Sequence, residues 1–252
     1  MKYFFSDSWE MTKRNLIRYR RSPRLIFFAT VQPIMFVLLF AYVFGSAINI
    51  PGTSYINYLI PAIIIQTVLF GAMNTGIGLA EDFKKGLIGR FRSLPMSRSA
   101  VFMGRTAADS IRNVFTVSVM IAVGYAIGFR IETNFGSALL AILLAVLLGY
   151  SLMWGMALIA MMAKESETVQ MAGMVFIFPL TFASSAFVPT ETMPAGLKWF
   201  AEHSPVTESI NTLRGLFLTG EYTDSLWKML VWIAVILIVF FPLAVRQYKK
   251  VA

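Results

Sequence analysis

Long apolar runs separated by short polar segments dominate the hydropathy pattern of this chain. Several runs approach or exceed twenty residues, and about 20 helical residues are needed to cross roughly 30 Å of hydrocarbon. A soluble core helix does not need that length, so the pattern predicts an all-α integral membrane protein with six transmembrane helices. The expected spans are residues 25–47, 55–80, 111–129, 135–163, 169–188 and 226–245.

The segment before the first span, residues 6–22, has a helical period but is too polar to cross a membrane. At about 100° per residue, a mostly apolar set of side chains falls in one narrow sector, and arginines lie opposite. We expect this helix to lie in the membrane interface with its apolar face down, because Trp and Tyr favour that depth. A solvated helix packed on the protein's own surface is the alternative. The apolar sector consists of Phe5, Trp9, Thr12, Leu16 and Tyr19.

A basic segment between the second and third spans is the most polar internal stretch of the chain. Apolar residues recur there at spacings of three and four, which predicts a short amphipathic helix over residues 82–95, ended by Pro95. We expect the first turns of the following helix to be solvated. Arg105, Asp109 and Arg112 are spaced there by four and three, so Asp109 can pair with both arginines.

Residues 189–221, before the last span, have a lower hydropathy without the composition of a linker. Two short amphipathic helices are expected there, divided by Ser204 and Pro205. Both are too short and too polar to cross a bilayer. We therefore expect partly embedded, re-entrant helices on the outer side of the membrane.

The formal net charge of +9 is explained by the distribution of the basic residues. Of the 22 Lys and Arg, all but Arg130, Lys198, Arg214 and Lys228 fall on the side of the two termini in a six-span topology. Because positive residues mark the cytoplasmic side, both termini and residues 82–95 are expected in the cytoplasm. Nucleic acid is not expected as a partner, since the basic residues lie where apolar runs end.

Several kinds of chemistry lack the residues that they require. No expected span carries a charge near its middle, which argues against a proton- or sodium-driven carrier. No G-x-x-x-x-G-K-[ST] motif is present, so we expect no nucleotide site in this chain. With His203 as the single histidine and no cysteine, we expect no catalytic residues, no metal site and no cofactor in this chain.

Two stretches, EDFKKGLIGRFRSLPMSRSAVFMGRTAADSIRN and FASSAFVPTETMPAGLKWFAEHSPVTESINTLRGL, carry a family resemblance. Together with the order of the elements, they are similar to the permease subunits of type 2 ATP-binding-cassette exporters, daunorubicin-type drug-resistance branch. The resemblance covers nearly the whole chain. One departure is Ser204-Pro205, where many relatives have Asn-Pro.

The resemblance implies an ATP-driven exporter of hydrophobic or amphipathic compounds in a bacterial or archaeal cell membrane. Two copies of a cytoplasmic ABC ATPase subunit would carry the ATP and Mg. A second permease chain, either another copy or a paralogue, would complete the pathway. The chain itself would not be an enzyme.

The resemblance also identifies residues 82–95 as the coupling helix that transmits ATP-driven closure of the ATPase pair. Apolar side chains would anchor in a groove on the ATPase, and arginines would pair with acids at its rim. The alternative is that the basic residues only set topology and bind anionic membrane lipids. The expected coupling residues are Phe83, Leu87, Arg90, Phe91, Arg92 and Leu94.

Neutral polar side chains on the first, second and fifth spans are candidates to line a pathway for amphipathic or lipid-like cargo. Hydrogen bonding between helices of one bundle is the alternative. The candidates are Gln32, Asn57, Gln66, Asn74, Thr181, Ser184 and Ser185.

Two other functions remain open from the sequence. Export of lipid-linked glycans would use the same architecture. A non-transporting membrane scaffold would recruit a cytoplasmic partner through the basic helix, and its activity would not depend on ATP.

Overall fold

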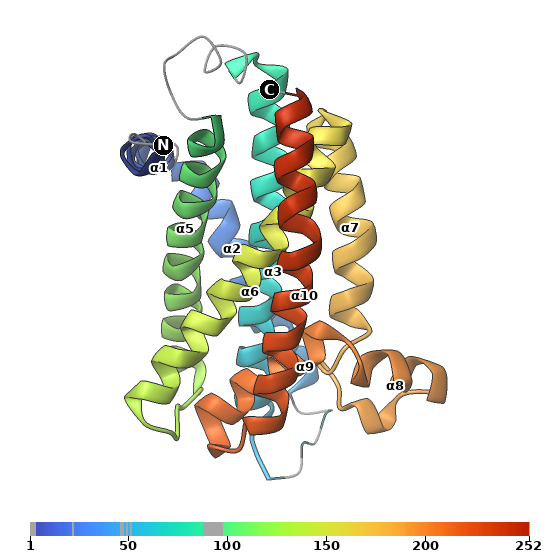
Figure 1. Ribbon diagram of the computed structural model, residues 1–252. Helices are drawn as coiled ribbons and strands as arrows, with labels where there is room; N and C mark the ends of the chain where they lie inside the picture. The colour runs from blue at the N-terminus through green and yellow to red at the C-terminus, as the bar shows by residue number, and fades with distance from the viewer. Residues whose placement is uncertain are drawn as a thin grey trace.

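The computed structural model describes residues 4–21, 23–45, 48, 50, 52–87 and 98–251, and every regular element in this part of the chain is a helix. The α-helices form one bundle, with short π- and 3-10 turns at some of their ends (Figure 1). The elements are α1 (Phe4–Arg21), α2 (Pro23–Leu39), η1 (Phe40–Phe44), α3 (Tyr55–Lys84), α5 (Arg98–Ile127), α6 (Phe135–Ala163), α7 (Ser166–Phe182), η2 (Thr190–Thr192), α8 (Ala195–Glu202), α9 (Pro205–Arg214), η3 (Gly215–Thr219) and α10 (Thr223–Val251).

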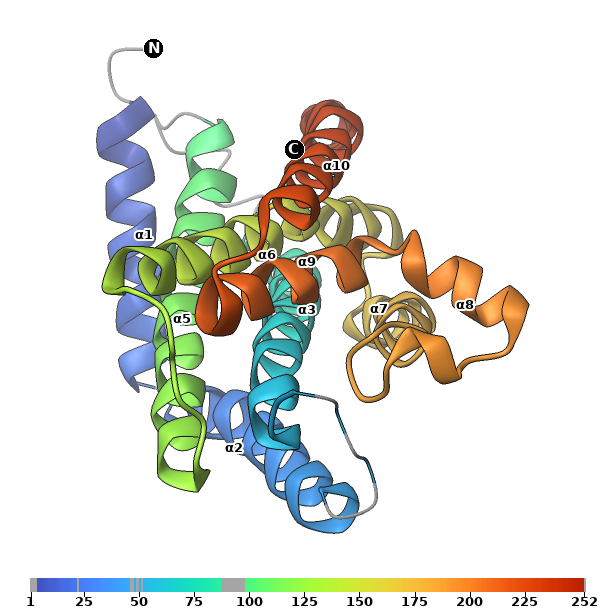
Figure 2. The ribbon, with the colours of Figure 1, turned by 90° about the horizontal axis from the view of Figure 1, so that it is seen from below.

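Helix α3 lies at the centre of the bundle, with α2, α5, α6, α7 and α9 packed around it (Figure 2). Its most apolar stretch is 89% buried, so this helix is a core element and not a lipid-facing one. At its first turn, the Ser54 side chain accepts a hydrogen bond from the backbone N–H of Asn57, which caps the helix. Glycines on α3 allow close approach of large side chains, since a Cβ at Gly78 would lie 2.0 Å from Nη2 of Arg105.

Four helices in the described residues are long and apolar enough to cross a membrane, by length and composition. They are Tyr55–Lys84, Ala100–Ile127, Phe135–Ala163 and Thr223–Tyr248. These helices overlap the second, third, fourth and sixth predicted spans. Helix α6 has the same bounds as the fourth predicted span, residues 135–163.

The fifth predicted span is shorter in the structure than expected. The first corresponds to α2 and the π-turn η1, which together run over residues 23–44 and include an apolar stretch over Thr30–Phe44. Helix α7 ends at Phe182 and not at residue 188. The chain leaves the helix there so that the backbone carbonyl of Ser185 can accept hydrogen bonds from Tyr58 and Arg214.

The expectation of solvated first turns in the third span is wrong. Helix α5 begins at Arg98, and its first half is covered by α1 and α3. Arg105 is 7% exposed and Asp109 is fully buried. Paired charges make this burial tolerable, because each has a partner of opposite sign.

Helix α1 lies across one end of the bundle: it is seen end-on in Figure 1 and lengthwise in Figure 2. It packs on α5, where a Cβ at Gly104 would come within 2.4 Å of Cβ of Met11. The predicted apolar sector is therefore divided between two environments. Thr12 is buried against the bundle, whereas Phe5 and Trp9 are exposed. An exposed aromatic strip on a transverse helix suits the expected interfacial position.

The predicted helix over residues 82–95 is interrupted near its start. Helix α3 continues through residue 82 to Lys84, and Gly86 has a φ of 66°. A glycine with a left-handed backbone conformation commonly follows the last turn of a helix. Residues 82–84 therefore belong to α3 and not to a separate helix. Residues 88–97 lie outside the described part of the chain, and with them Arg90, Phe91, Arg92 and Leu94.

The region before α10 forms the short helices α8 and α9, at the opposite end of the bundle from α1 (Figure 1). The side-chain oxygen of Ser204 accepts a hydrogen bond from the backbone N–H of Val206 at 3.3 Å. Pro205 occupies the first helical position of α9, where a missing N–H has no cost. Ser204 therefore caps α9, the role that an Asn would also fill.

Candidate functional site

Six charged side chains from α1, α3 and α5 meet at the end of the bundle where α1 lies. Three arginines and three carboxylates form a continuous set of ion pairs, which we call the ion cluster, and Lys85 adds a more exposed pair with Glu81 at 3.1 Å. Because each buried charge of the ion cluster has a partner of opposite sign, the cluster can exist in a poorly solvated place. Its members are Arg18, Glu81, Asp82, Arg105, Asp109 and Arg112.

Asp82, at the end of α3, is held from two sides. Arg18 of α1 donates from Nη1 to Oδ1 of Asp82 at 3.2 Å, and from Nη2 to Glu81 at 3.3 Å. Arg105 of α5 donates to the other carboxylate oxygen of Asp82. These bonds join the end of α3 to both neighbouring helices.

Asp109 lies between two arginines, as the spacing on α5 predicts, and this pairing is confirmed. Nε of Arg105 lies 3.7 Å and Nη1 of Arg112 lies 3.5 Å from its carboxylate oxygens. Tyr19 of α1 donates its hydroxyl proton to the same carboxylate. Burial, and then the charge of Asp109, raises the pKa of Tyr19 to about 12. Tyr19 therefore remains a neutral hydrogen-bond donor at physiological pH.

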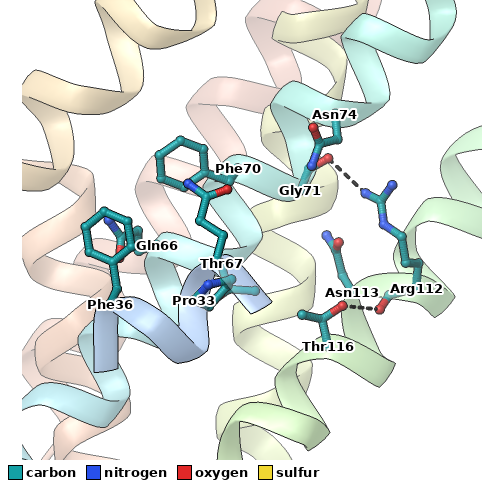
Figure 3. A pocket seen from close by; sticks show the side chains of 11 residues that line it. Pro33, Phe36, Gln66, Thr67, Phe70, Gly71, Asn74, Arg112, Asn113 and Thr116 are labelled. Carbon is teal, nitrogen blue, oxygen red and sulfur yellow. Dashed lines mark hydrogen bonds between the residues drawn. The ribbon is translucent and has the colours of Figure 1, made fainter. Parts of the chain in front are cut away.

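Arg112 connects the ion cluster to a small polar cavity among α2, α3 and α5 (Figure 3). Its Nη2 donates to the backbone carbonyl of Gly71 at 3.0 Å. The cavity has a volume of about 30 Å³, which is room for a group the size of one water molecule. The lining residues are Gln32, Pro33, Phe36, Gln66, Thr67, Phe70, Gly71, Asn74, Arg112, Asn113 and Thr116.

Two buried amide nitrogens in this lining have no hydrogen-bond partner in the described residues: Nε2 of Gln66 and Nδ2 of Asn113. Asn113 is confined between two glycines, since a Cβ at Gly71 would lie 2.5 Å from its Oδ1 and one at Gly149 would lie 3.1 Å from its Nδ2. A buried donor without an acceptor is costly. The lining can therefore gain a hydrogen bond from a polar group that enters when the helices move apart.

The structure brings together three of the seven predicted pathway residues. Gln32, Gln66 and Asn74 line the polar cavity. Asn57 lies at the opposite end of α3, where its side-chain oxygen accepts a hydrogen bond from the backbone N–H of Arg130 at 3.1 Å. The remaining three lie at the end of α7 and in the turn after it, away from the cavity: Thr181, Ser184 and Ser185.

Two of the predicted coupling residues are described. Phe83 is partly buried and packs against the core, and Leu87 is half-buried at the edge of the described residues. Three residues that line the polar cavity were not predicted to belong to the pathway: Arg112, Asn113 and Thr116. Their spacing was a usable signal, because together with Asp109 they form one polar side of α5. That side was expected to face solvent, so its residues were not assigned to the pathway.

A second polar cluster ties α9 to the bundle at the other end. The guanidinium of Arg214 lies 3.4 Å from the ring centroid of Tyr58. It donates to the carbonyl oxygens of Ser185 at 2.7 Å and Tyr58 at 3.1 Å. Nearby, Lys228 on α10 lies 3.2 Å from Glu208 on α9, a pairing that the sequence did not reveal.

No group of three His, Cys, Asp or Glu that could hold a metal ion occurs among the described residues. The described polar groups instead form ion pairs and hydrogen bonds between helices. They can hold helices in register and can exchange partners when the helices move.

Comparisons with known proteins agree with this membrane architecture. The family model described as "ABC-2 type transporter" matches residues 7–218. The chain is 28% identical over 240 residues to the daunorubicin resistance ABC transporter permease protein DrrB1 of Streptomyces coeruleorubidus, covering 94% of this chain and 84% of the relative. It is 28% identical over 246 residues to a probable doxorubicin resistance ABC transporter permease protein, DrrC, of Mycobacterium tuberculosis, with coverage of 97% and 89%. A putative transport permease, ycf38, of Cyanophora paradoxa is 22% identical over 263 residues, with coverage of 99% and 90%.

Proposed function

Because the chain belongs to the ABC-2 type transporter family, we propose that it exports hydrophobic or amphipathic compounds, such as drugs, antibiotics or lipid-like molecules. It is a multi-pass membrane permease subunit without an ATPase domain, and its family implies a separate ATPase partner. In the proposed assembly, two ATPase subunits power two permease chains, each with six spans and cytoplasmic termini. In this topology, α2 and η1 together form the first span, and α7 forms the fifth.

The cargo class is supported by two independent features. Two of the three relatives named above carry daunorubicin or doxorubicin resistance in their descriptions, and these two are 28% identical to this chain. The polar cavity carries amide and hydroxyl groups beside aromatic rings, and its one cation, Arg112, is neutralised by Asp109. Once the helices move apart, such a lining would offer hydrogen bonds to the few polar groups of an amphipathic compound.

The observation that carries the proposal is the continuous connection from the end of α3 to the polar cavity. Asp82 is the first residue of the segment 82–95 that is proposed to contact the ATPase, and it binds Arg105. Arg105 and Arg112 share Asp109, and Arg112 reaches the cavity. A force on the coupling segment would therefore move helices that line the cavity.

The test begins with the tagged chain purified gently from its native membranes. We expect an ATP-hydrolysing protein to co-purify in a fixed ratio, and inverted vesicles to accumulate daunorubicin only with ATP. Leu94→Asp should abolish the co-purification or uncouple hydrolysis from uptake, whereas Leu94→Met should retain both. A well-folded chain without an ATPase partner would contradict the proposal and favour a scaffold. ATP-dependent assembly without drug uptake would refute the cargo class alone.

A further inference from the structure

A second cavity, of about 400 Å³, lies between α7 and α10, with α3 and α6 behind it, and Pro205 of α9 also lines it. Its size falls in the range of small-molecule pockets. The lining is apolar throughout, apart from the ring nitrogen of a tryptophan. It includes Ala72, Gly155, Phe176, Trp232, Ile236 and Phe240. We call it the apolar groove.

The apolar groove opens on the outer surface of the bundle. Phe176, one of its lining residues, is 59% exposed. The helices on both sides are apolar, and α10 is one of the four that are long enough to cross a membrane. The medium at the mouth is therefore hydrocarbon and not water, and a cavity without polar groups does not retain water.

The absence of polar groups in this lining limits the kind of ligand. Sites that orient a compound usually combine apolar walls with a few placed donors or acceptors. The acyl chain of a lipid needs no donor or acceptor in its site, because the polar headgroup of the lipid lies outside the site. We propose that the apolar groove binds one acyl chain of an anionic phospholipid from the cytoplasmic leaflet.

Charge at the cytoplasmic end of α10 supports this choice of lipid. Arg246 lies six residues beyond Phe240, which is about 9 Å along the helix. It is exposed and forms no ion pair with the residues that the structure describes. Lys250 is exposed about one turn further along. These cations lie at the level where a headgroup phosphate would be held, while its chain descends along Phe240 and Ile236.

Photolabelling of the full chain in membrane vesicles tests the proposal. The probe is phosphatidylglycerol with a diazirine on one acyl chain, and labelled positions are mapped by peptide mass spectrometry. We expect label on Phe176 and Ile236. Gly155→Leu should reduce it several-fold, because a Cβ at Gly155 would meet Phe240 at an ordinary 3.7 Å and the longer side chain would fill the groove. Ala234→Leu, on an exposed face of α10, should leave it unchanged.

Two further variants keep the test decisive. Ile236→Trp fills the groove from α10 and replaces Gly155→Leu if that variant does not fold. Arg246→Gln should remove the preference for phosphatidylglycerol over a phosphatidylcholine probe with the same chain. Equal labelling of the wild-type and filled grooves, or label spread over all exposed positions, would overturn the proposal.

Other occupants give distinct results, each of which would also overturn it. The chain has no native cysteine, so Phe176→Cys reports contacts without background. An intermolecular disulfide at that position would show that a second copy covers the groove. Displacement of the lipid label by daunorubicin would assign the groove to cargo. Neither result would affect the export function, which is tested by ATP-dependent uptake.

Discussion

Arg105 on α5 donates a hydrogen bond to Asp82 at the end of α3, and both side chains are at least nine-tenths buried. Arg18 on α1 donates to the other oxygen of the same carboxylate. One carboxylate therefore connects three helices at the first residue of the segment 82–95 that is proposed to meet the ATPase. Its removal should affect stability far more than loss of an ordinary surface charge.

We expect Asp82→Asn to lower the free energy of unfolding by about 3 kcal/mol, because it removes the closer of the two ion pairs of the buried Arg105 and leaves only the 3.7 Å contact with Asp109. Thermal or denaturant unfolding of the purified chain measures the change. Glu10→Gln is the control, since Glu10 forms an exposed pair with Lys13 at 2.8 Å, and it should cost about 1 kcal/mol or less. A similar small effect of both changes would show that the Asp82 pairs contribute little.

The ion cluster also shows what could be predicted from the sequence. The pairs of Asp109 with Arg105 and Arg112 lie within one helix, so their spacing of four and three was sufficient. The bond between Arg18 and Asp82 joins residues 64 positions apart. Only the packing of α1 on the bundle brings them together, and hydropathy contains no information on that packing.

The ends of the helices show the same distinction: those set by neighbouring residues could be predicted from the sequence, and those set by contacts with distant residues could not. The bounds of α6 were predicted because local signals set them: Asn134 caps its start, accepting from the N–H of Ser137, and Lys164 takes a left-handed conformation at its end. The charged first turns of α5 were predicted to be helical, but their burial was not predicted, because charged turns were interpreted as solvated. The early end of α7 depends on hydrogen bonds from Tyr58 and Arg214 to Ser185, which no local pattern reveals.

We expect Gly104→Ala to loosen the packing of α1 on α5. The new Cβ would lie 2.4 Å from Cβ of Met11 and 2.7 Å from the backbone oxygen of Ser8, which is closer than real contacts allow. Overpacking of this kind costs about 1–3 kcal/mol, and unfolding experiments measure it. Gly196→Ala on α8 is the matched control, because nothing lies within 4 Å of its Cβ position. It should be neutral or stabilising by about 0.5–1 kcal/mol, from helix propensity. Equal stability of the two variants would contradict the close contact.

Arg214→Lys should weaken the attachment of α9 to α3, even though the charge is retained. Lysine cannot stack flat on Tyr58 while it also donates to the carbonyls of Ser185 and Tyr58. We expect a loss of about 2 kcal/mol or more, with faster amide exchange in α8 and α9 measured by mass spectrometry. Lys198→Gln, which removes an exposed pair with Glu202 at 3.7 Å, should change neither quantity. Unchanged exchange in Arg214→Lys would mean that apolar packing alone holds α9.

Gln66→Leu separates stability from transport at the polar cavity. Because Nε2 of Gln66 has no partner in the described residues, an apolar side chain of similar size loses no hydrogen bond there. The free energy of unfolding should therefore change by less than about 1 kcal/mol. ATP-dependent daunorubicin uptake should nevertheless fall several-fold if the amide contacts cargo as the helices open. Gln170→Leu, at an exposed position of α7, provides the same chemical change away from the cavity and should leave uptake unaltered. Normal uptake by a stable Gln66→Leu variant would mean that the amide only fills space between α2 and α3, and the pathway would have to lie elsewhere in the assembly.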